Sequence, residues 1–347
     1  MKILSIDTSC DETSVAITEG RRVLSNVIYS QMLMHKEWGG VVPSIAKRAH
    51  EERISSVIEE AFKKAKVTGD DLDYIAVTYG PGLAIALEVG IKHARELAQK
   101  YSKPLIAVNH MEGHIYASFV QNSKGNPDHG FHFPYLALLI SGAHTELVIV
   151  KDHLTYEIIG KTRDDAAGEA IDKAARMLEL GYPGGPPLER LAAEVENVDI
   201  YKFPRSMLQS HDLDFSFSGL KTSFMYFLKN MSDEDKHSHI NNLASSFQDA
   251  VFDSMLRKTE KAIQQTGISN LIVGGGVSAN QYLRKLLRKL AATYNGEVFF
   301  PTYKTLTGDN AAMIGVAAYY RAQKGLYVPA TEKIDRVPRL SLKDTSI

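Results

Sequence analysis

The 347-residue sequence has few features of a secreted or membrane protein. Its one cysteine, Cys10, has no partner for an internal disulfide, which is typical of a reducing compartment. The N-terminus, MKILSIDTSCDETSVAI, has neither the long apolar stretch nor the small-residue cleavage site of a signal peptide. The longest uncharged apolar stretches, such as residues 135–140 and 311–320, are much too short to span a bilayer. These absences predict a soluble, cytoplasmic protein that does not bind a membrane.

The sequence also lacks an excess of charge of either sign. With 40 basic and 41 acidic residues, the formal net charge of −1 gives no overall field that would attract nucleic acid. An RNA partner would therefore have to bind a local basic patch. The composition, 44% hydrophobic and 23% charged, is typical of a globular protein, and at this length two domains are expected.

The pattern of apolar residues predicts an α/β fold with two similarly built halves. Three short strands within residues 2–30, the first at 2–7, and a loop around Trp38 are followed by alternating helices and strands up to about residue 119, including a helix at about 84–101. A similar start, with strands at 135–140, 145–150 and 155–161, appears about 135 residues later, and helices dominate after it, among them one expected over residues 233–265. We therefore predict an N-terminal lobe (1–125) completed by the helix at 309–325, a C-terminal lobe (133–308) and a tail (326–347).

Two histidines are the clearest candidates for metal ligands. His110 and His114 follow a predicted strand, and at positions i and i+4 of a helix they can bind one ion. Two unrelated histidines are the alternative, but catalytic sites in α/β proteins collect at the carboxyl ends of strands. Glu112 stands at i+2 and would point away from the ion, unlike the glutamate of the HExxH zinc proteases. Asp309 is either the N-cap of the last helix or a third ligand of a site suited to Fe(II) or Zn(II).

Three turns rich in small residues are candidate phosphate-binding loops. They are residues 7–9, 141–145 and 274–280. Backbone N–H groups in such turns attract phosphate, although each turn taken alone is weak support. Asp172, inside an Ala-rich helix, either binds ribose hydroxyls or belongs to a solvated helix face. Together these features indicate a nucleotide site, although neither a dinucleotide fingerprint nor a GxxxxGK[ST] loop is present.

Nine motifs, in order between residues 5 and 313, resemble one known family. They are SIDTSCDETSVAI, GPGL, NHMEGHIYA, LLISGAHTEL, DDAAGEAIDK, GYPGGPPLE, DFSFSGLKT, GGGVSAN and TGDNAAM. The family is that of the tRNA threonylcarbamoyladenosine transferases, formerly labelled O-sialoglycoprotein endopeptidases or glycoproteases. The resemblance implies the α/β fold of actin, sugar kinases and acetate kinase, with two ribonuclease H-like lobes and a nucleotide cleft between them.

The resemblance also implies roles for individual residues. His110, His114 and Asp309 would bind one divalent ion, Fe(II) or Zn(II), and Asp11 and Glu12 would lie near the reacting groups. Threonylcarbamoyl-adenylate would be bound by Leu139, Ile140, Ser141, Gly142, Ala143, Asp172, Gly185, Glu189 and Asn280. The family usually has Gly-Gly where this sequence has Gly142-Ala143, and Ala143 would cost about 1 kcal/mol if that position needs a positive φ.

The reaction implied is a metal-assisted acyl transfer. The threonylcarbamoyl group would pass from the adenylate to the exocyclic amine of the adenosine 3′ of the anticodon, in tRNAs reading ANN codons, with release of AMP. The resemblance implies as partners a separate adenylate-forming enzyme, a small paralogous subunit and an ATPase subunit. The alternatives are a metalloprotease, a small-molecule kinase of the same fold, and an assembly subunit without catalytic activity.

A helix near residues 279–292 is a candidate surface for tRNA phosphates. Arg284, Lys285, Arg288 and Lys289 share one side of this helix, and Lys304 follows it. A solvated helix face is the alternative.

Overall fold

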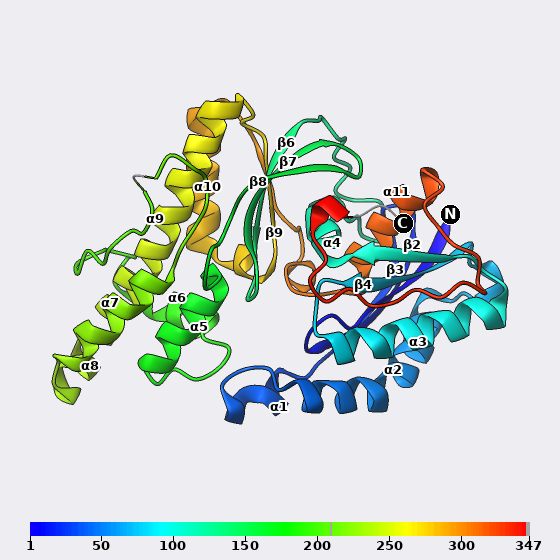
Figure 1. The fold of residues 1–347 in the computed structure, drawn as a ribbon, viewed down its shortest axis with the longest axis horizontal. Helices are drawn as coiled ribbons and strands as arrows, with labels where there is room; N and C mark the ends of the chain where they lie inside the picture. The colour runs from blue at the N-terminus through cyan, green and yellow to red at the C-terminus, as the bar shows by residue number, and fades with distance from the viewer. Residues whose placement is uncertain (209, 345–347) are drawn as a thin grey trace. The chain divides into compact units, whose positions relative to one another are not determined.

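The computed structural model describes residues 1–208 and 210–344, which form two compact units (Figure 1). Unit 1 comprises Met1–His132, Asp152–Tyr156 and Phe300–Ile347. Unit 2 comprises Phe133–Lys151 and Glu157–Phe299. Each unit is built on a five-stranded mixed sheet, so the predicted α/β class and the repeated strand–turn–strand start are confirmed.

The sheet of unit 1 has the strand order β3-β2-β1-β4-β5. The strands are β1 (Lys2–Asp7), β2 (Glu12–Glu19), β3 (Arg22–Ser30), β4 (Tyr74–Gly80) and β5 (Leu105–Asn109). The first three strands pair antiparallel, and β1, β4 and β5 pair in parallel. The carboxyl ends of β1, β4 and β5 therefore lie at one edge, where side chains of a site can converge.

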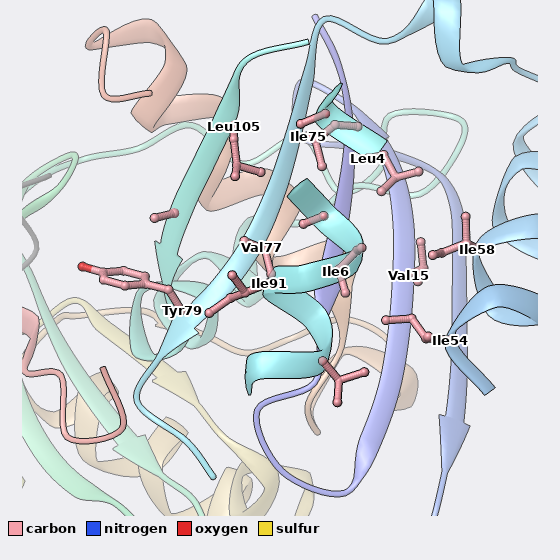
Figure 2. Packing of buried hydrophobic residues seen from close by; sticks show 14 of the residues in the cluster. Leu4, Ile6, Val15, Ile54, Ile58, Ile75, Val77, Tyr79, Ile91 and Leu105 are labelled. Carbon is pink, nitrogen blue, oxygen red and sulfur yellow. The ribbon is translucent and has the colours of Figure 1, made fainter. Parts of the chain in front are cut away.

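Alternating side chains of this sheet build two apolar layers. Leu4, Ile6 and Val77 face the long helices α2 (Pro43–Ala65) and α3 (Ala84–Tyr101), as Figure 2 shows for part of this core. Their neighbours Ile3 and Ala76 face α4 (His110–Tyr116) and α11 (Ala311–Gln323). The final helix thus covers the second face of the N-terminal sheet. The shorter elements of this unit are α1 (Met32–His35), η1 (Lys36–Trp38), η2 (Gly69–Asp71), η3 (Ala117–Phe119), η5 (Lys304–Leu306) and η6 (Leu342–Asp344).

The sheet of unit 2 has the order β10-β9-β6-β7-β8. The strands are β6 (Tyr135–Ile140), β7 (Thr145–Asp152), β8 (Thr155–Lys161), β9 (Leu271–Gly274) and β10 (Val298–Phe299). As in unit 1, an antiparallel hairpin, here β6–β7, is extended by parallel strands. The helices are α5 (Ala167–Met177), α6 (Gly185–Glu194), α7 (Ser218–Lys229), α8 (Asp233–Ser238), α9 (Ile240–Thr266), η4 (Gly276–Ala279) and α10 (Gln281–Thr293).

Several element boundaries differ from the sequence prediction by a few residues, and one predicted helix is divided in two. The single helix predicted over residues 233–265 is interrupted at His239, where φ is −109° and ψ is 12°, so α8 and α9 are separate. The last helix begins at Ala311, two residues after the predicted start at Asp309. Among the described residues, no helix has the length and apolarity that a membrane span requires.

Candidate functional site

The two candidate histidine ligands lie on α4, which begins directly after β5. Asn109 ends the strand and caps the helix, because its side chain accepts a hydrogen bond from the backbone N–H of Met111 at 2.8 Å. This cap satisfies one of the free N–H groups at the helix start. It also fixes the first turn of α4, so that His110 and His114 project from one side of a buried helix.

The structure brings His110, His114 and Asp309 together. The Nε2 atoms of His110 and His114 lie 3.3 Å and 3.4 Å from Oδ1 of Asp309. One potential ligand atom from each residue lies within 4.8 Å of the others. The two imidazole rings meet edge to face, with their centroids 4.6 Å apart. These are the three residues that the sequence offers as metal ligands, and in the structure their side chains converge on one point.

Asp309 is free for this role because its neighbour caps the last helix. The side chain of Asn310 accepts from the backbone N–H of Met313 at 3.1 Å, and Asn310 is the N-cap of α11. Of the two roles open to Asp309 from the sequence, the N-cap is therefore excluded. Its carboxylate faces the two imidazoles instead.

The electrostatics of this cluster favour a positive charge at its centre. Burial by itself lowers the pKa of His110, but the carboxylates of Asp309 and Asp7 outweigh it and raise that pKa well above its usual value. Burial lowers the pKa of His114. Burial opposes ionisation of Asp309, yet the two imidazoles hold the pKa of Asp309 far below its usual range. Two carboxylates that stabilise a proton on His110 would stabilise a cation bound in its place.

The donor set also passes a test of fit for a metal ion. Among the described residues, neither ring nitrogen of the buried His114 has a hydrogen-bond partner, and Nε2 has only its 3.4 Å contact with Asp309, which is uncommon for buried polar atoms. Oδ2 of Asp7 lies 3.5 Å from Nδ1 of His110, on the side away from Asp309. A carboxylate behind a ligating histidine fixes the tautomer that presents the other nitrogen to the metal. The cluster therefore fits a divalent ion held by two nitrogens and one oxygen.

Glu112 is directed away from this cluster, as its position in the helix predicted. Its two carboxylate oxygens lie 3.3 Å and 3.1 Å from Nη1 of Arg321 on α11. Both side chains are almost completely buried. Burial raises the pKa of Glu112, and the guanidinium of Arg321 opposes that shift. Glu112 therefore ties the ligand helix to α11 and is not placed to activate a metal-bound water.

The predicted catalytic carboxylates, Asp11 and Glu12, follow β1 in the same unit. Oε1 of Glu12 accepts a hydrogen bond from the hydroxyl of Ser30 at 3.2 Å. Burial, and then the negative charges of Asp11 and Asp309, raise the pKa of Glu12 well above its usual value. Glu12 is thus close enough to the histidine–aspartate cluster for their charges to interact.

In unit 2, the predicted substrate loop joins β6 to β7. Leu139 and Ile140 end β6, and the backbone N–H of Ser141 donates to the carbonyl of His144 at 2.8 Å to close the turn. The hydroxyl of Ser141 accepts from the N–H groups of Ala143 and His144. Neither Gly142 nor Ala143 has a positive φ. Alanine in place of the usual glycine therefore costs no backbone strain in this turn.

The glycine-rich turn after β9 lies against the end of β6. Leu139 pairs with Gly274, and a Cβ atom on Gly275, where φ is +91°, would meet the carbonyl oxygen of Ile140 at 2.3 Å. Only glycine fits this close approach. After η4, the side chain of Asn280 caps α10 by accepting from Leu283 N–H at 2.9 Å.

Asp172, Gly185 and Glu189 lie in the same unit but already have partners within the protein. Oδ1 of Asp172 accepts from the N–H of Gly184 at 2.7 Å, and Glu189 accepts from the N–H of Gln281 at 2.7 Å. Burial raises the pKa of Asp172, and the N–H groups of Gly184 and Gly185 oppose that shift. Asp172 thus holds the PGGPP loop, a contact that the sequence did not reveal.

The predicted basic surface is divided by the structure. Lys285 and Lys289 are exposed on α10, but Arg284 is half-buried and donates through Nε to the carbonyl of Ser278 at 2.6 Å. Burial lowers the pKa of Arg284. Lys304 belongs to unit 1 and α10 to unit 2. The predicted run of neighbouring basic residues is therefore shorter than the sequence suggested.

Comparison with known proteins defines first the fold and then the family. The chain is similar to the crystal structure of T. kodakarensis HypF, with a TM-score of 0.62 and 14% identity over 94% of this chain and 48% of that one. At this identity the similarity shows only the fold, which is the α/β fold predicted from the sequence.

The sequence relatives are far more similar. The family profile described as tRNA N6-adenosine threonylcarbamoyltransferase (TsaD) matches residues 22–316. Proteins of that name from Kosmotoga olearia and Staphylococcus aureus are 46% and 48% identical, over 99% and 94% of this chain and 99% and 93% of theirs. The chain belongs to the tRNA N6-adenosine threonylcarbamoyltransferase family.

Proposed function

We propose that this chain transfers a threonylcarbamoyl group from threonylcarbamoyl-adenylate to the exocyclic amine of the adenosine 3′ of the anticodon, in tRNAs that read ANN codons. The observation that carries this proposal is the relation to threonylcarbamoyltransferases over almost the entire chain. The reaction is an acyl transfer. The amine nitrogen attacks the carbamoyl carbon, the bond from that carbon to the phosphate oxygen breaks, AMP leaves with the electron pair, and the amine loses a proton.

We assign the adenylate to unit 2. The turn 141–144 and the glycine-rich turn at Gly274–Gly276 converge where β6 and β9 end, and both offer backbone N–H groups to a phosphate. Asp172 and Glu189 hold the neighbouring loop and the start of α10 in place. Leu139, Ile140, Gly185 and Asn280 complete the residues assigned to this ligand.

We assign one divalent ion, Fe(II) or Zn(II), to His110, His114 and Asp309. When bound, such an ion supplies a Lewis acid that stabilises negative charge on a carbonyl oxygen. The carboxylate of Asp7, 3.5 Å from Nδ1 of His110, would favour the tautomer that presents Nε2 to the ion.

The amine proton needs an acceptor, and we assign this role to Asp11 or Glu12. The exocyclic amine of adenine is a poor nucleophile because its lone pair is delocalised into the ring, so positioning and proton removal both matter. Glu12 lies beside the cluster, and its raised pKa makes its carboxylate a stronger base than an exposed one. The target base is in a single-stranded loop, where a base can be unstacked at small cost.

The reaction also requires other proteins. We propose that a separate enzyme makes the adenylate, and that a small paralogous subunit and an ATPase subunit assist this chain in the cytoplasm, where tRNA is modified.

A metalloprotease is not supported, because Glu112, the glutamate nearest to the histidines in sequence, is committed to Arg321. The test is transfer of labelled threonine to unmodified tRNA by the purified chain, with the adenylate-forming enzyme and the partner subunits supplied. Label should appear in the tRNA with the wild type and with a His237→Ala control on exposed α8, but not with His114→Ala. Absence of label with the wild type would contradict the proposed function, and peptide-bond cleavage lost in His114→Ala would favour the protease.

A further inference from the structure

The segment between β3 and α2, residues 31–42, exposes large apolar side chains. Leu33, on the short helix α1 (Figure 1), is 78% exposed. Trp38, the last residue of the short helix η1, is 65% exposed. Trp38 is the only tryptophan of the chain. Large apolar side chains this exposed in an ordered part of a protein often mark an interaction surface.

The segment is nevertheless well anchored, because a network of hydrogen bonds between buried side chains holds it against the rest of unit 1. The Nδ1 atom of His35 accepts from the backbone N–H of Val42 at 3.3 Å, so its Nε2–H is left to donate to Oε1 of Gln31, 3.3 Å away. The amide nitrogen of Gln31 then donates to Nδ1 of His50 at 3.2 Å. The hydroxyl of Thr13 donates to the same nitrogen at 2.8 Å.

The tautomers are consistent along the whole chain of hydrogen bonds. His50 accepts at Nδ1 and therefore carries its proton on Nε2, which donates to the carbonyl of Cys10 at 3.0 Å. His35, Gln31 and His50 are all fully buried. Hydrogen bonds therefore hold the segment at Gln31, His35 and Val42. Trp38 lies on this anchored segment with its side chain exposed to solvent.

The same contacts place the segment beside the predicted catalytic carboxylates. The backbone N–H of Gln31 donates to the carbonyl of Asp11 at 3.0 Å, and the hydroxyl of Ser30 donates to Glu12. The segment that carries Leu33 and Trp38 therefore starts at a residue that is hydrogen-bonded to Asp11.

We propose that Trp38 is a stacking platform for a nucleobase of the tRNA anticodon loop, presented by the anchored segment 31–42, whose first residue is bonded to Asp11. This inference rests on the proposed function, because it takes the tRNA as the substrate. Unpaired bases in RNA loops are commonly bound by stacking on aromatic rings, and an indole offers the largest ring surface among the side chains.

The surroundings favour a base over a second protein. The apolar patch does not continue along α2, because the fifth and sixth residues of that helix are Lys47 and Arg48, which are paired with Glu51 and Glu52. A stable protein interface needs roughly 800 Å² on each side, whereas a single base needs only one exposed ring. Because these charges are paired, we expect Trp38 and its surroundings to bind RNA by stacking, with little attraction from net charge.

The single tryptophan allows a direct test. An unmodified anticodon stem-loop RNA, titrated into the full chain, should quench the intrinsic fluorescence to saturation, because Trp38 is the only indole. Trp38→Ala should weaken binding of this RNA by about 10- to 100-fold, the range expected for loss of one stacked base, and Trp38→Phe should lie between. The slope of log affinity against log salt should stay the same, because no phosphate contact is lost.

Leu33→Ala is the matched control, since Leu33 is even more exposed in the same segment but cannot stack. It should bind RNA within about twofold of the wild type. The inference is overturned if the RNA does not quench Trp38, if Trp38→Ala binds as the wild type does, or if Leu33→Ala loses as much as Trp38→Ala. Quenching by a partner subunit instead of RNA would also overturn it and would identify a protein-docking surface.

The transfer assay separates this inference from the proposed function. If the wild type transfers threonine to tRNA while Trp38→Ala has an unchanged KM for tRNA, only the platform is refuted. If the wild type shows no transfer to tRNA, the proposed function itself fails. Support for the platform requires a raised KM for tRNA in Trp38→Ala, with unchanged thermal stability and an intermediate KM in Trp38→Phe.

Discussion

The buried ion pair between Glu112 and Arg321 provides a sharp test of how the ligand helix is held. The pair joins α4 to α11, and the two residues are 209 positions apart in the sequence. Replacing Glu112 with leucine leaves the guanidinium of Arg321 buried without its carboxylate. Such a loss costs about 3–5 kcal/mol of unfolding free energy.

Replacing both partners should cost much less than the sum of the single changes. In Glu112→Leu/Arg321→Met no charge remains buried, and apolar side chains of similar volume fill the space, so we expect a net cost of about 1–2 kcal/mol. The double-mutant cycle should therefore give a coupling energy of at least about 2 kcal/mol. Arg321 makes further contacts, and the cycle isolates its interaction with Glu112 from them.

The assay is urea unfolding followed by far-UV circular dichroism. The control is the Lys47–Glu51 pair on α2, an exposed i,i+4 pair with 3.7 Å between its charged atoms, whose coupling should stay near 0.3–0.5 kcal/mol. A coupling for Glu112–Arg321 as small as that of the control would refute the reasoning. It would mean that α4 is held by apolar packing alone.

Three further predictions concern the metal, the PGGPP loop and pH. The double variant His110→Ala/His114→Ala should retain its fold but lose its bound divalent ion, and full metal occupancy by elemental analysis would contradict the assignment. Asp172→Ala removes a charge-assisted hydrogen bond to Gly184 and should weaken AMP binding by about 1.5–3 kcal/mol, measured by calorimetry; unchanged affinity would restrict Asp172 to holding the loop. Burial lowers the pKa of His50 below its ordinary value of 6.5, so the stability it contributes is present above that pH and lost as the pH falls through the lower folded-state pKa. The urea midpoint should therefore drop on acidification more steeply in the wild type than in His50→Gln, and parallel curves would show that His50 is not responsible.

Local patterns in the sequence were sufficient for most of the secondary structure. The bounds of β1, β6, β8 and α3 match the predicted ranges, since each has a clear apolar period and a clear turn or cap at its ends. The break at His239 is not apparent from the sequence, because neither glycine nor proline marks it. The helices around Trp38 were missed because they are single turns, held by buried side chains that are distant in sequence.

Helix geometry was also sufficient to predict that His110 and His114 point to the same side of their helix and that Glu112 points away from them. Positions i and i+4 share a face and position i+2 does not, and the structure bears out both statements. Geometry could not distinguish the roles of Asp309 and Asn310, since either residue type caps a helix well. That choice depends on where the two imidazoles lie, which is tertiary information.

The contacts that give the candidate site its chemistry are those that sequence spacing leaves invisible. Asp7, predicted as part of a phosphate-binding turn, stands behind His110 from the end of another strand. Arg321 interrupts an otherwise apolar helix, a visible signal whose meaning appears only when its partner, Glu112, is found across the packed face. A ligand pair on one helical turn can arise in many proteins. This pair becomes a candidate metal centre through the residues around it. Asp7 at the end of β1 supplies the opposing charge, Asn109 at the end of β5 caps the helix, and Arg321 on α11 anchors it.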